Sequence, residues 1–186
     1  MDPVEVIEGD VSVLDRADVD TDQIIPKQFL KRVERTGFGE FLFYDWLRDG
    51  EIELEPNPIL VAGPNFGSGS SREHAVWALA DFGFRAVIAP SFSDIFYANS
   101  TKNGLLPVVL PRQECRGIAE AGRARIDLDD QTVDYAGGVV RFEVEEDIKH
   151  RLLGGLDEIS VTLARAEAID AYEAANPSPG RATTAL

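Results

Sequence analysis

The residues best suited to chemistry lie in one glycine- and serine-rich stretch, Gly63–Ala75. The stretch follows an apolar run, Ile59–Ala62, and leads into a helical pattern. A loop that leaves a strand and enters a helix directs free backbone N–H groups and the positive end of the helix dipole at one point. The stretch therefore predicts a site for an anion, either a carboxylate or a phosphate.

The common phosphate and nucleophile motifs do not fit this stretch. A P-loop needs a lysine where Ser71 and Arg72 stand, and the dinucleotide-binding pattern needs a third glycine. In the nucleophile elbow G-x-S-x-G, Gly69 would occupy the position of the serine, counted from Gly67. The expected anion site is therefore of another kind.

Two interpretations of Ser70 remain open on its residue pattern. Ser70-x-x-Glu73 has the form of a capping box, in which the serine hydroxyl would accept a hydrogen bond from a backbone N–H at the start of the helix. Alternatively, one of the two successive serines caps while the other faces a ligand, and Arg72 provides a two-pronged clamp for a carboxylate. His74 has apolar neighbours and belongs to no HExxH pair, so we interpret it as a structural residue.

A basic cluster lies nearer the N-terminus, at Lys27, Lys31, Arg32 and Arg35, with only Glu34 opposing it. The rest of the chain is strongly acidic, with 33 acidic against 18 basic residues and a formal net charge of −15. Such a field repels polyanions, which argues against nucleic-acid and anionic-membrane roles. The basic cluster is either a solvated loop or a positive rim that admits a dicarboxylate.

The composition also bears on the compartment and the source. A single cysteine, Cys115, rules out an internal disulfide framework and a four-cysteine metal site, and residues Met1–Asp10 do not have the pattern of a basic, apolar leader. We therefore expect a cytoplasmic protein. The bases are four lysines and fourteen arginines. This Lys-poor, acid-rich pattern suits a halophilic source, although a high-GC genome would produce the same arginine excess.

The hydrophobic pattern predicts an α/β fold with a mainly parallel βαβ part followed by a short antiparallel meander. The expected strands of the first part are Val11–Leu14, Ile59–Ala62, Ala86–Ala89 and Pro107–Leu110. The expected helices are Gly39–Leu47, Arg72–Phe82, Ser93–Asn99 and Arg112–Ala121. The meander comprises Ala124–Leu128, Thr132–Tyr135 and Val139–Val144.

One domain is expected over residues 1–175, closed by an amphipathic helix at Leu163–Ala175. Residues 176–186 contain two prolines and a glycine with little to bury, which predicts a flexible C-terminal tail.

The ordered motifs of this chain resemble those of the small subunits of 3-isopropylmalate dehydratase, within the aconitase superfamily. The blocks that carry the resemblance are Val19–Val33, Arg35–Gly39, Asn65–Leu79, Ala89–Asn99, Leu105–Val108 and Gly155–Leu163. The signature G-S-S-R-E-H-A within Asn65–Leu79 is specific to this superfamily. The resemblance implies the swivelling β/β/α domain that forms the mobile fourth domain of aconitases, here as a separate chain.

The resemblance also implies a partner and a cofactor. The [4Fe–4S] cluster of the family needs three cysteine ligands, which lie on the large subunit, and this chain has only Cys115. In the mechanism that the resemblance implies, one cluster iron would act as a Lewis acid on the substrate, and water would be removed and re-added through isopropylmaleate in leucine biosynthesis. The chain is thus expected to be a hydro-lyase subunit that is active only with the large subunit.

Carried over by motif, Ser70 corresponds to the catalytic base. Ser71 and Arg72 correspond to substrate-binding residues, and Gly69 is also expected to contact the substrate. The N–H groups of the loop Gly67–Ser71, the helix dipole and Arg72 would stabilise the Ser70 alkoxide.

The superfamily uses a second arginine on a substrate carboxylate, and Arg32 and Arg35 are both candidates. Asp20, Thr21 and Asp22 are interpreted as shaping the site entrance. Phe29, Leu30 and Val33 could contact the substrate's isopropyl group, but local packing is the default interpretation.

Two alternatives remain beside this hypothesis. The first is the small subunit of a sister isomerase, of the homoaconitase or methylmalate/citraconate type, since a pocket that differs by a methyl group discriminates by only about 1–3 kcal/mol. The second is a non-catalytic anion-binding module, against which the intact Ser70 and Arg72 argue.

Overall fold

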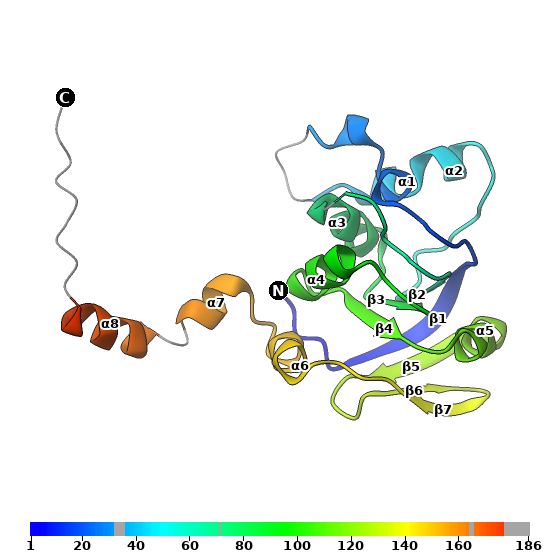
Figure 1. Ribbon diagram of the computed structural model, residues 1–186. Helices are drawn as coiled ribbons and strands as arrows, with labels where there is room; N and C mark the ends of the chain where they lie inside the picture. The colour runs from blue at the N-terminus through cyan, green and yellow to red at the C-terminus, as the bar shows by residue number, and fades with distance from the viewer. Residues whose placement is uncertain (32–35, 71, 164–165, 177–186) are drawn as a thin grey trace.

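The computed structural model describes residues 1–31, 36–70, 72–163 and 166–176. Its centre is one seven-stranded mixed sheet with the strand order β4-β3-β2-β1-β5-β6-β7 (Figure 1). The strands are β1 (Val6–Leu14), β2 (Ile59–Ala62), β3 (Ala86–Ala89), β4 (Leu106–Val109), β5 (Arg123–Asp127), β6 (Thr132–Tyr135) and β7 (Gly138–Arg141). The parallel part with an antiparallel meander, predicted from the sequence, is confirmed.

Strand β1 joins the two parts of the sheet. Its second half, Val11–Leu14, pairs in parallel with β2, and its first half, Val6–Asp10, pairs antiparallel with β5. Only the second half was predicted. In the first half, Ile7 is buried and Glu8 and Asp10 are exposed. This half was not predicted because its acidic residues do not indicate a strand, and its pairing with β5 is visible only in the structure.

Helices cover both faces of the parallel part of the sheet, so all residues of β2 and β3 are buried. Helices α3 (Glu73–Phe82) and α4 (Asp94–Lys102) lie over one face, where Leu60, Val87 and Phe96 share a buried cluster. Helix α5 (Arg112–Ala121) covers the other face and contributes Cys115 and Ile118. Helix α6 (Glu146–Leu153) packs there too, through Leu152.

The segment before β2 differs from its prediction. A single helix was expected over Gly39–Leu47, but the structure has a 3₁₀ turn at Gly39–Phe41 and a separate helix α2 at Tyr44–Arg48. Phe43 separates them with a φ of +45°, and its N–H donates to the Ile24 carbonyl at 2.8 Å. This tertiary hydrogen bond competes with the helical one. A second short helix, α1 (Thr21–Ile24), packs beside α2 and α3.

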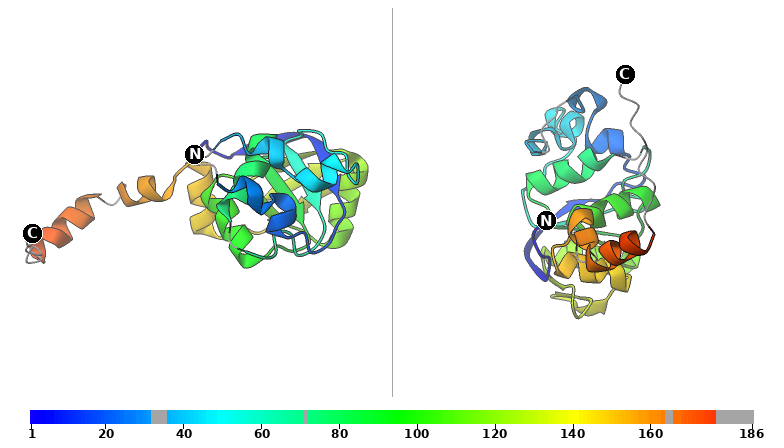
Figure 2. Two further views of the ribbon diagram at one scale, coloured as in Figure 1. Left: turned by 90° about the horizontal axis from the view of Figure 1, so that it is seen from above. Right: turned by 90° about the vertical axis from the view of Figure 1, so that its left-hand side faces the viewer.

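The C-terminal helix does not close the domain as expected. The structure has α7 (Glu158–Leu163) and α8 (Ala166–Ala175), which extend away from the body (Figures 1 and 2). No residue of α8 is buried, and Tyr172 is 69% exposed. The apolar positions of α8 therefore have no contact with the sheet. The boundary at residue 175 stays a prediction, and residues 177–186 lie outside the described residues.

Among the described residues, no helix combines the length and apolar character needed to cross a membrane.

Candidate active site

The loop between β2 and α3 lies at the carboxyl end of the parallel strands, where open α/β sheets place their ligands. This loop is held in place by contacts with the segment that precedes α4. The Phe66 N–H donates to the Ser91 carbonyl at 3.1 Å, and the Ser93 hydroxyl donates to the Gly67 carbonyl at 2.5 Å. Gly67 has a φ of +76° and lies against the Phe96 ring, so the close approach requires glycine here.

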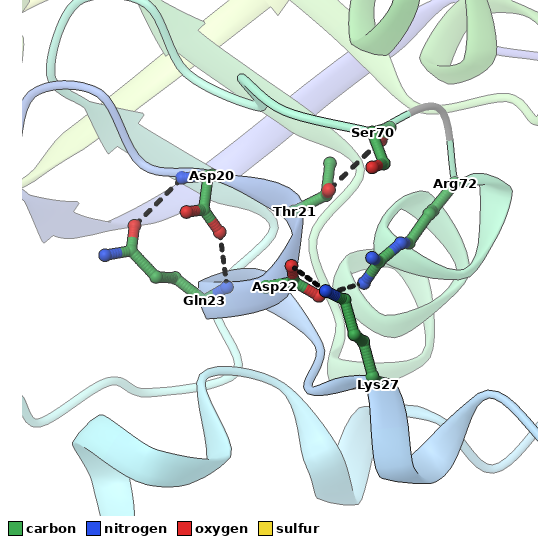
Figure 3. Close-up of polar contacts among 7 residues, drawn as sticks. All are labelled: Asp20, Thr21, Asp22, Gln23, Lys27, Ser70 and Arg72. Atoms are coloured by element: carbon green, nitrogen blue, oxygen red, sulfur yellow. Dashed lines mark hydrogen bonds and ion pairs between the residues drawn. The ribbon is translucent and has the colours of Figure 1, made fainter.

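The segment around α1 runs beside the same loop, although it lies far away in the sequence (Figure 3). Helix α1 begins with a capping box, in which the Asp20 carboxylate accepts from the Gln23 N–H at 2.9 Å. The Thr21 N–H donates to the Ser68 carbonyl at 2.9 Å, and the Thr21 hydroxyl donates to the Ser70 carbonyl at 3.0 Å. These bonds fix α1 against the end of the loop.

Ser70 is exposed and does not cap a helix. Helix α3 begins at Glu73 with Arg72 as its N-cap residue, and no side chain accepts a capping hydrogen bond there. The capping-box interpretation of Ser70 and Glu73 is therefore wrong, because the helix starts too late for the serine to reach the cap position. Among the described residues, no hydrogen-bond partner is found for the Ser70 hydroxyl. Ser71 lies outside the described residues.

Fewer backbone donors are free in this loop than the sequence predicts. The N–H groups of Gly67 and Ser68 both donate to the Val19 carbonyl, at 2.8 and 3.1 Å. The expectation that the whole Gly67–Ser71 segment offers N–H groups to an anion is therefore wrong for these two residues. Within the described part of the chain, the N–H groups of Gly69 and Ser70 remain without a partner. Gly69 has a φ of +89°, which turns the loop at this point.

Arg72 forms an ion pair that was not predicted (Figure 3). Its side chain is only 12% exposed, and its Nη1 donates to Oδ1 of Asp22 in the first turn of α1. The Lys27 ammonium lies 3.3 Å from the other oxygen of Asp22. Burial opposes the ionisation of Asp22, but hydrogen bonds from Arg72 and Lys27 outweigh it and hold the pKa of Asp22 below its ordinary value. Asp22 is therefore a carboxylate at neutral pH.

His74 has the structural environment expected of it. Its ring packs against Trp77 and Phe38, with centroid distances of 4.7 and 5.2 Å. Burial lowers the pKa of His74, with a further contribution from nearby Arg72, so the imidazole is neutral at pH 7. It therefore adds no positive charge to the site.

The basic cluster is only partly described. Lys27 is committed to Asp22 and Lys31 is exposed, whereas Arg32 and Arg35 lie outside the described residues. Phe29 stacks on Phe41 at a centroid distance of 4.0 Å, and Leu30 packs against the core. Local packing, the default interpretation of Phe29 and Leu30, is thus confirmed; Val33 also lies outside the described residues.

Sequence reasoning missed the contacts of Thr21 with Ser70 and of Asp22 with Arg72. The acids around Thr21 were a visible signal, since alternating carboxylates beside a basic cluster suggest ion pairs. Nothing local in the sequence, however, indicated that their partner would be Arg72.

Cys115 lies on the other face of the sheet, where it is 4% exposed. Burial raises the pKa of its thiol to about 11, which keeps the sulfur protonated and a poor metal ligand. Among the described residues, no group of three or more His, Cys, Asp or Glu side chains could hold a metal ion. The residues described here therefore do not fit an iron–sulfur cluster.

The mixed sheet and its glycine- and serine-rich loop are those of an aconitase-type domain. The family model of the aconitase C-terminal domain matches residues 51–113, which include β2, the loop, α3, β3, α4 and β4.

Comparison with individual proteins narrows this class. The chain is 53% identical to the 3-isopropylmalate dehydratase small subunit of Rhodopirellula baltica, over 91% of this chain and 96% of that protein. It is 52% identical to the small subunit of Halalkalibacterium halodurans, over 94% and 98%. A crystal structure of 3-isopropylmalate dehydratase from Methanocaldococcus jannaschii superimposes with a TM-score of 0.71 at 29% identity, covering 90% of this chain and 99% of that one. The chain belongs to the family of 3-isopropylmalate dehydratase small subunits.

Proposed function

We propose that this chain, with a large subunit, interconverts 2-isopropylmalate and 3-isopropylmalate by dehydration to isopropylmaleate and rehydration, a step of leucine biosynthesis. The observation that carries the proposal is the position of Ser70. Ser70 is exposed at the end of the loop and its hydroxyl does not cap helix α3, and Arg72 follows two residues later in the sequence. A proton acceptor beside a carboxylate clamp is what a substrate with an acidic C–H bond next to a carboxylate requires.

In this proposal the two side chains have different tasks. Arg72 binds a substrate carboxylate, and Ser70 takes the proton from the neighbouring carbon as the substrate hydroxyl departs, so that the proton and hydroxide together make up the water lost. A serine hydroxyl is a weak acid, so its alkoxide needs stabilisation. Two features support this role: the N–H groups of Gly69 and Ser70, which have no partner among the described residues, and the positive end of the α3 dipole.

The remaining proposed site residues are Ser71, Arg32 and Arg35, which we assign to substrate carboxylates as the family resemblance implies. The basic cluster that contains Arg32 and Arg35 supports this assignment, because in a chain with a formal net charge of −15 a local positive charge would favour a dicarboxylate.

The large subunit supplies the [4Fe–4S] cluster in this proposal. The lone, buried Cys115 and the names of the relatives, which are small subunits, both support a partner that carries it. A cytoplasmic location completes the proposal, since a single unpaired thiol is ordinary in a reducing compartment.

The test is to co-express the chain with its large subunit, reconstitute the complex without oxygen and follow the loss of ultraviolet absorbance as isopropylmaleate is hydrated. Ser70→Ala should lower kcat by at least about 100-fold, as expected for loss of a general base, while assembly persists. Ser68→Ala is the matched control, because among the described residues the Ser68 hydroxyl forms a single hydrogen bond, to the Asp18 carbonyl at 3.3 Å. Near-normal kcat in Ser70→Ala would refute the proposed role of Ser70, and activity confined to homoaconitate or citraconate would change the substrate.

A further inference from the structure

Asp22 is the residue whose position the proposed reaction does not explain. It is a carboxylate in direct contact with Arg72, the group assigned to the carboxylate of the substrate (Figure 3). Two roles are open to a carboxylate in this position. It could occupy the guanidinium as a placeholder that substrate must displace, or it could hold the guanidinium in the orientation that receives substrate.

The attachment of α1 argues that the contact is built into the fold. Asp22 lies between the capping-box residues of α1 and directly follows Thr21, whose N–H and hydroxyl bind the carbonyls of Ser68 and Ser70. Arg72 is held in turn as the N-cap residue of α3. Both partners thus depend on rigid backbone segments, and each side chain needs little freedom to meet the other.

The geometry of the contact separates the two roles. Only Nη1 of Arg72 is bound by Asp22, and among the described residues the Nε and Nη2 atoms have no hydrogen-bond partner. A placeholder that imitates a substrate carboxylate would take the two-pronged edge of the guanidinium, since that is the strongest arrangement. Asp22 instead leaves donors of Arg72 available.

The charges agree with a permanent contact. Lys27 binds the second oxygen of Asp22 at 3.3 Å, so one carboxylate lies between two cations, and the three groups together keep a net positive charge. A second carboxylate can therefore approach Arg72 without removing the first. Without Asp22, Arg72 and Lys27 would repel each other, and the mostly buried guanidinium would lose its one described ionic partner.

We infer that Asp22 is a positioning residue, which holds Arg72 through Nη1 and presents the rest of the guanidinium to the carboxylate of the substrate. The inference rests on the proposed function. It concerns binding and not proton transfer, because Asp22 is turned toward Arg72 and Lys27 and is not assigned to the reacting carbon.

The test measures KM and kcat of the reconstituted complex with Asp22→Ala and Asp22→Asn. Asp22→Ala should raise KM about tenfold, equivalent to about 1.4 kcal/mol of lost binding, and change kcat less than about twofold. Asp22→Asn keeps an acceptor for Nη1 but loses the charge, so it should give an intermediate KM. Asp49→Ala is the matched control, because it removes an exposed carboxylate whose described ion-pair partner is Arg48, at 2.8 Å, and not Arg72 or Lys27.

Each outcome decides the question. A lower KM in either Asp22 variant would mean that Asp22 competes with substrate, and an unchanged KM would mean that the contact is incidental; both would overturn the inference. Circular dichroism and gel filtration identify a variant that fails to fold or assemble, and the nearly isosteric Asp22→Asn then serves as the test. If the wild-type complex is inactive, the proposed function fails, whereas an active wild type with unaltered Asp22 variants refutes this inference alone.

Discussion

Replacing Gly67 with alanine should destabilise the body of the protein and displace the loop that carries Ser70 and Arg72. An added Cβ at Gly67 would lie 2.1 Å from Cγ and 2.5 Å from Cβ of Phe96. Phe96 is 2% exposed and packs against the rings of Phe66 and Phe92, so it has little room to withdraw. The backbone is also constrained, because Gly67 has a φ of +76°.

The magnitude follows from two separable costs. A non-glycine residue in the left-handed region costs about 1 kcal/mol, and forcing an extra methyl group into a packed core costs about 1–3 kcal/mol more. Gly50→Ala provides the control, since Gly50 has a φ of +70° and no atom within 4 Å of the added Cβ. Gly50→Ala therefore bears only the backbone cost.

The assay is thermal unfolding of the isolated chain, followed by circular dichroism. The two costs total about 2–4 kcal/mol for Gly67→Ala, and in a chain of this size 1 kcal/mol lowers Tm by about 2–4 °C, so Gly67→Ala should lose about 4–16 °C and Gly50→Ala about 2–4 °C. In the reconstituted complex, Gly67→Ala should also lower kcat/KM, because the Gly67 carbonyl and N–H bind Ser93 and Val19 and fix the loop. Equal Tm values for the two variants would refute the assigned clash with Phe96.

Three further predictions concern the loop support, the thiol and the C-terminal helix. Ser93→Ala removes both the N-cap of α4 and the donor to the Gly67 carbonyl, so urea denaturation should show a loss of about 1–2 kcal/mol. Burial raises the pKa of Cys115 from 9.0 to about 11, and the folded state therefore retains the proton that the unfolded chain loses first. The unfolding free energy, measured relative to Cys115→Ala, should thus fall as pH rises from 9.0 to about 11, and a rise would contradict the burial of the thiol. Ending the chain after Leu163 removes α8, none of whose residues is buried, and should change Tm by less than about 2 °C; a larger loss would mean that α8 packs on the body.

The elements predicted correctly are those whose signal is local. Ile59–Ala62 and Ala86–Ala89 are continuous apolar runs between turn residues, and the structure has strands at these positions. The break at Phe43 was not predictable, because the hydrogen bond that favours it is donated by the Phe43 N–H to the carbonyl of Ile24 in another helix. The amphipathic pattern at the C-terminus correctly indicated helix, but a pattern does not say whether its apolar side meets the sheet.

The same distinction applies within the candidate site. Residue types and order brought out Ser70 and Arg72 as candidates and identified an aconitase-type signature. The start of α3 decided that Ser70 does not cap the helix. The Val19 carbonyl, which is remote in sequence, decided that Gly67 and Ser68 do not offer their N–H groups to a ligand.

The sequence by itself determined that this protein is an acidic α/β chain with one cysteine, with a serine–arginine loop between a strand and a helix and without the ligands of the cluster its family uses. These properties depend on composition and on neighbours along the chain. Only the tertiary structure decided that α1 lies against the loop and that Asp22 and Lys27 accompany Arg72. Hydrogen bonds and ion pairs act through space over a few ångströms, so partners far apart in the sequence are established only when the fold brings them together.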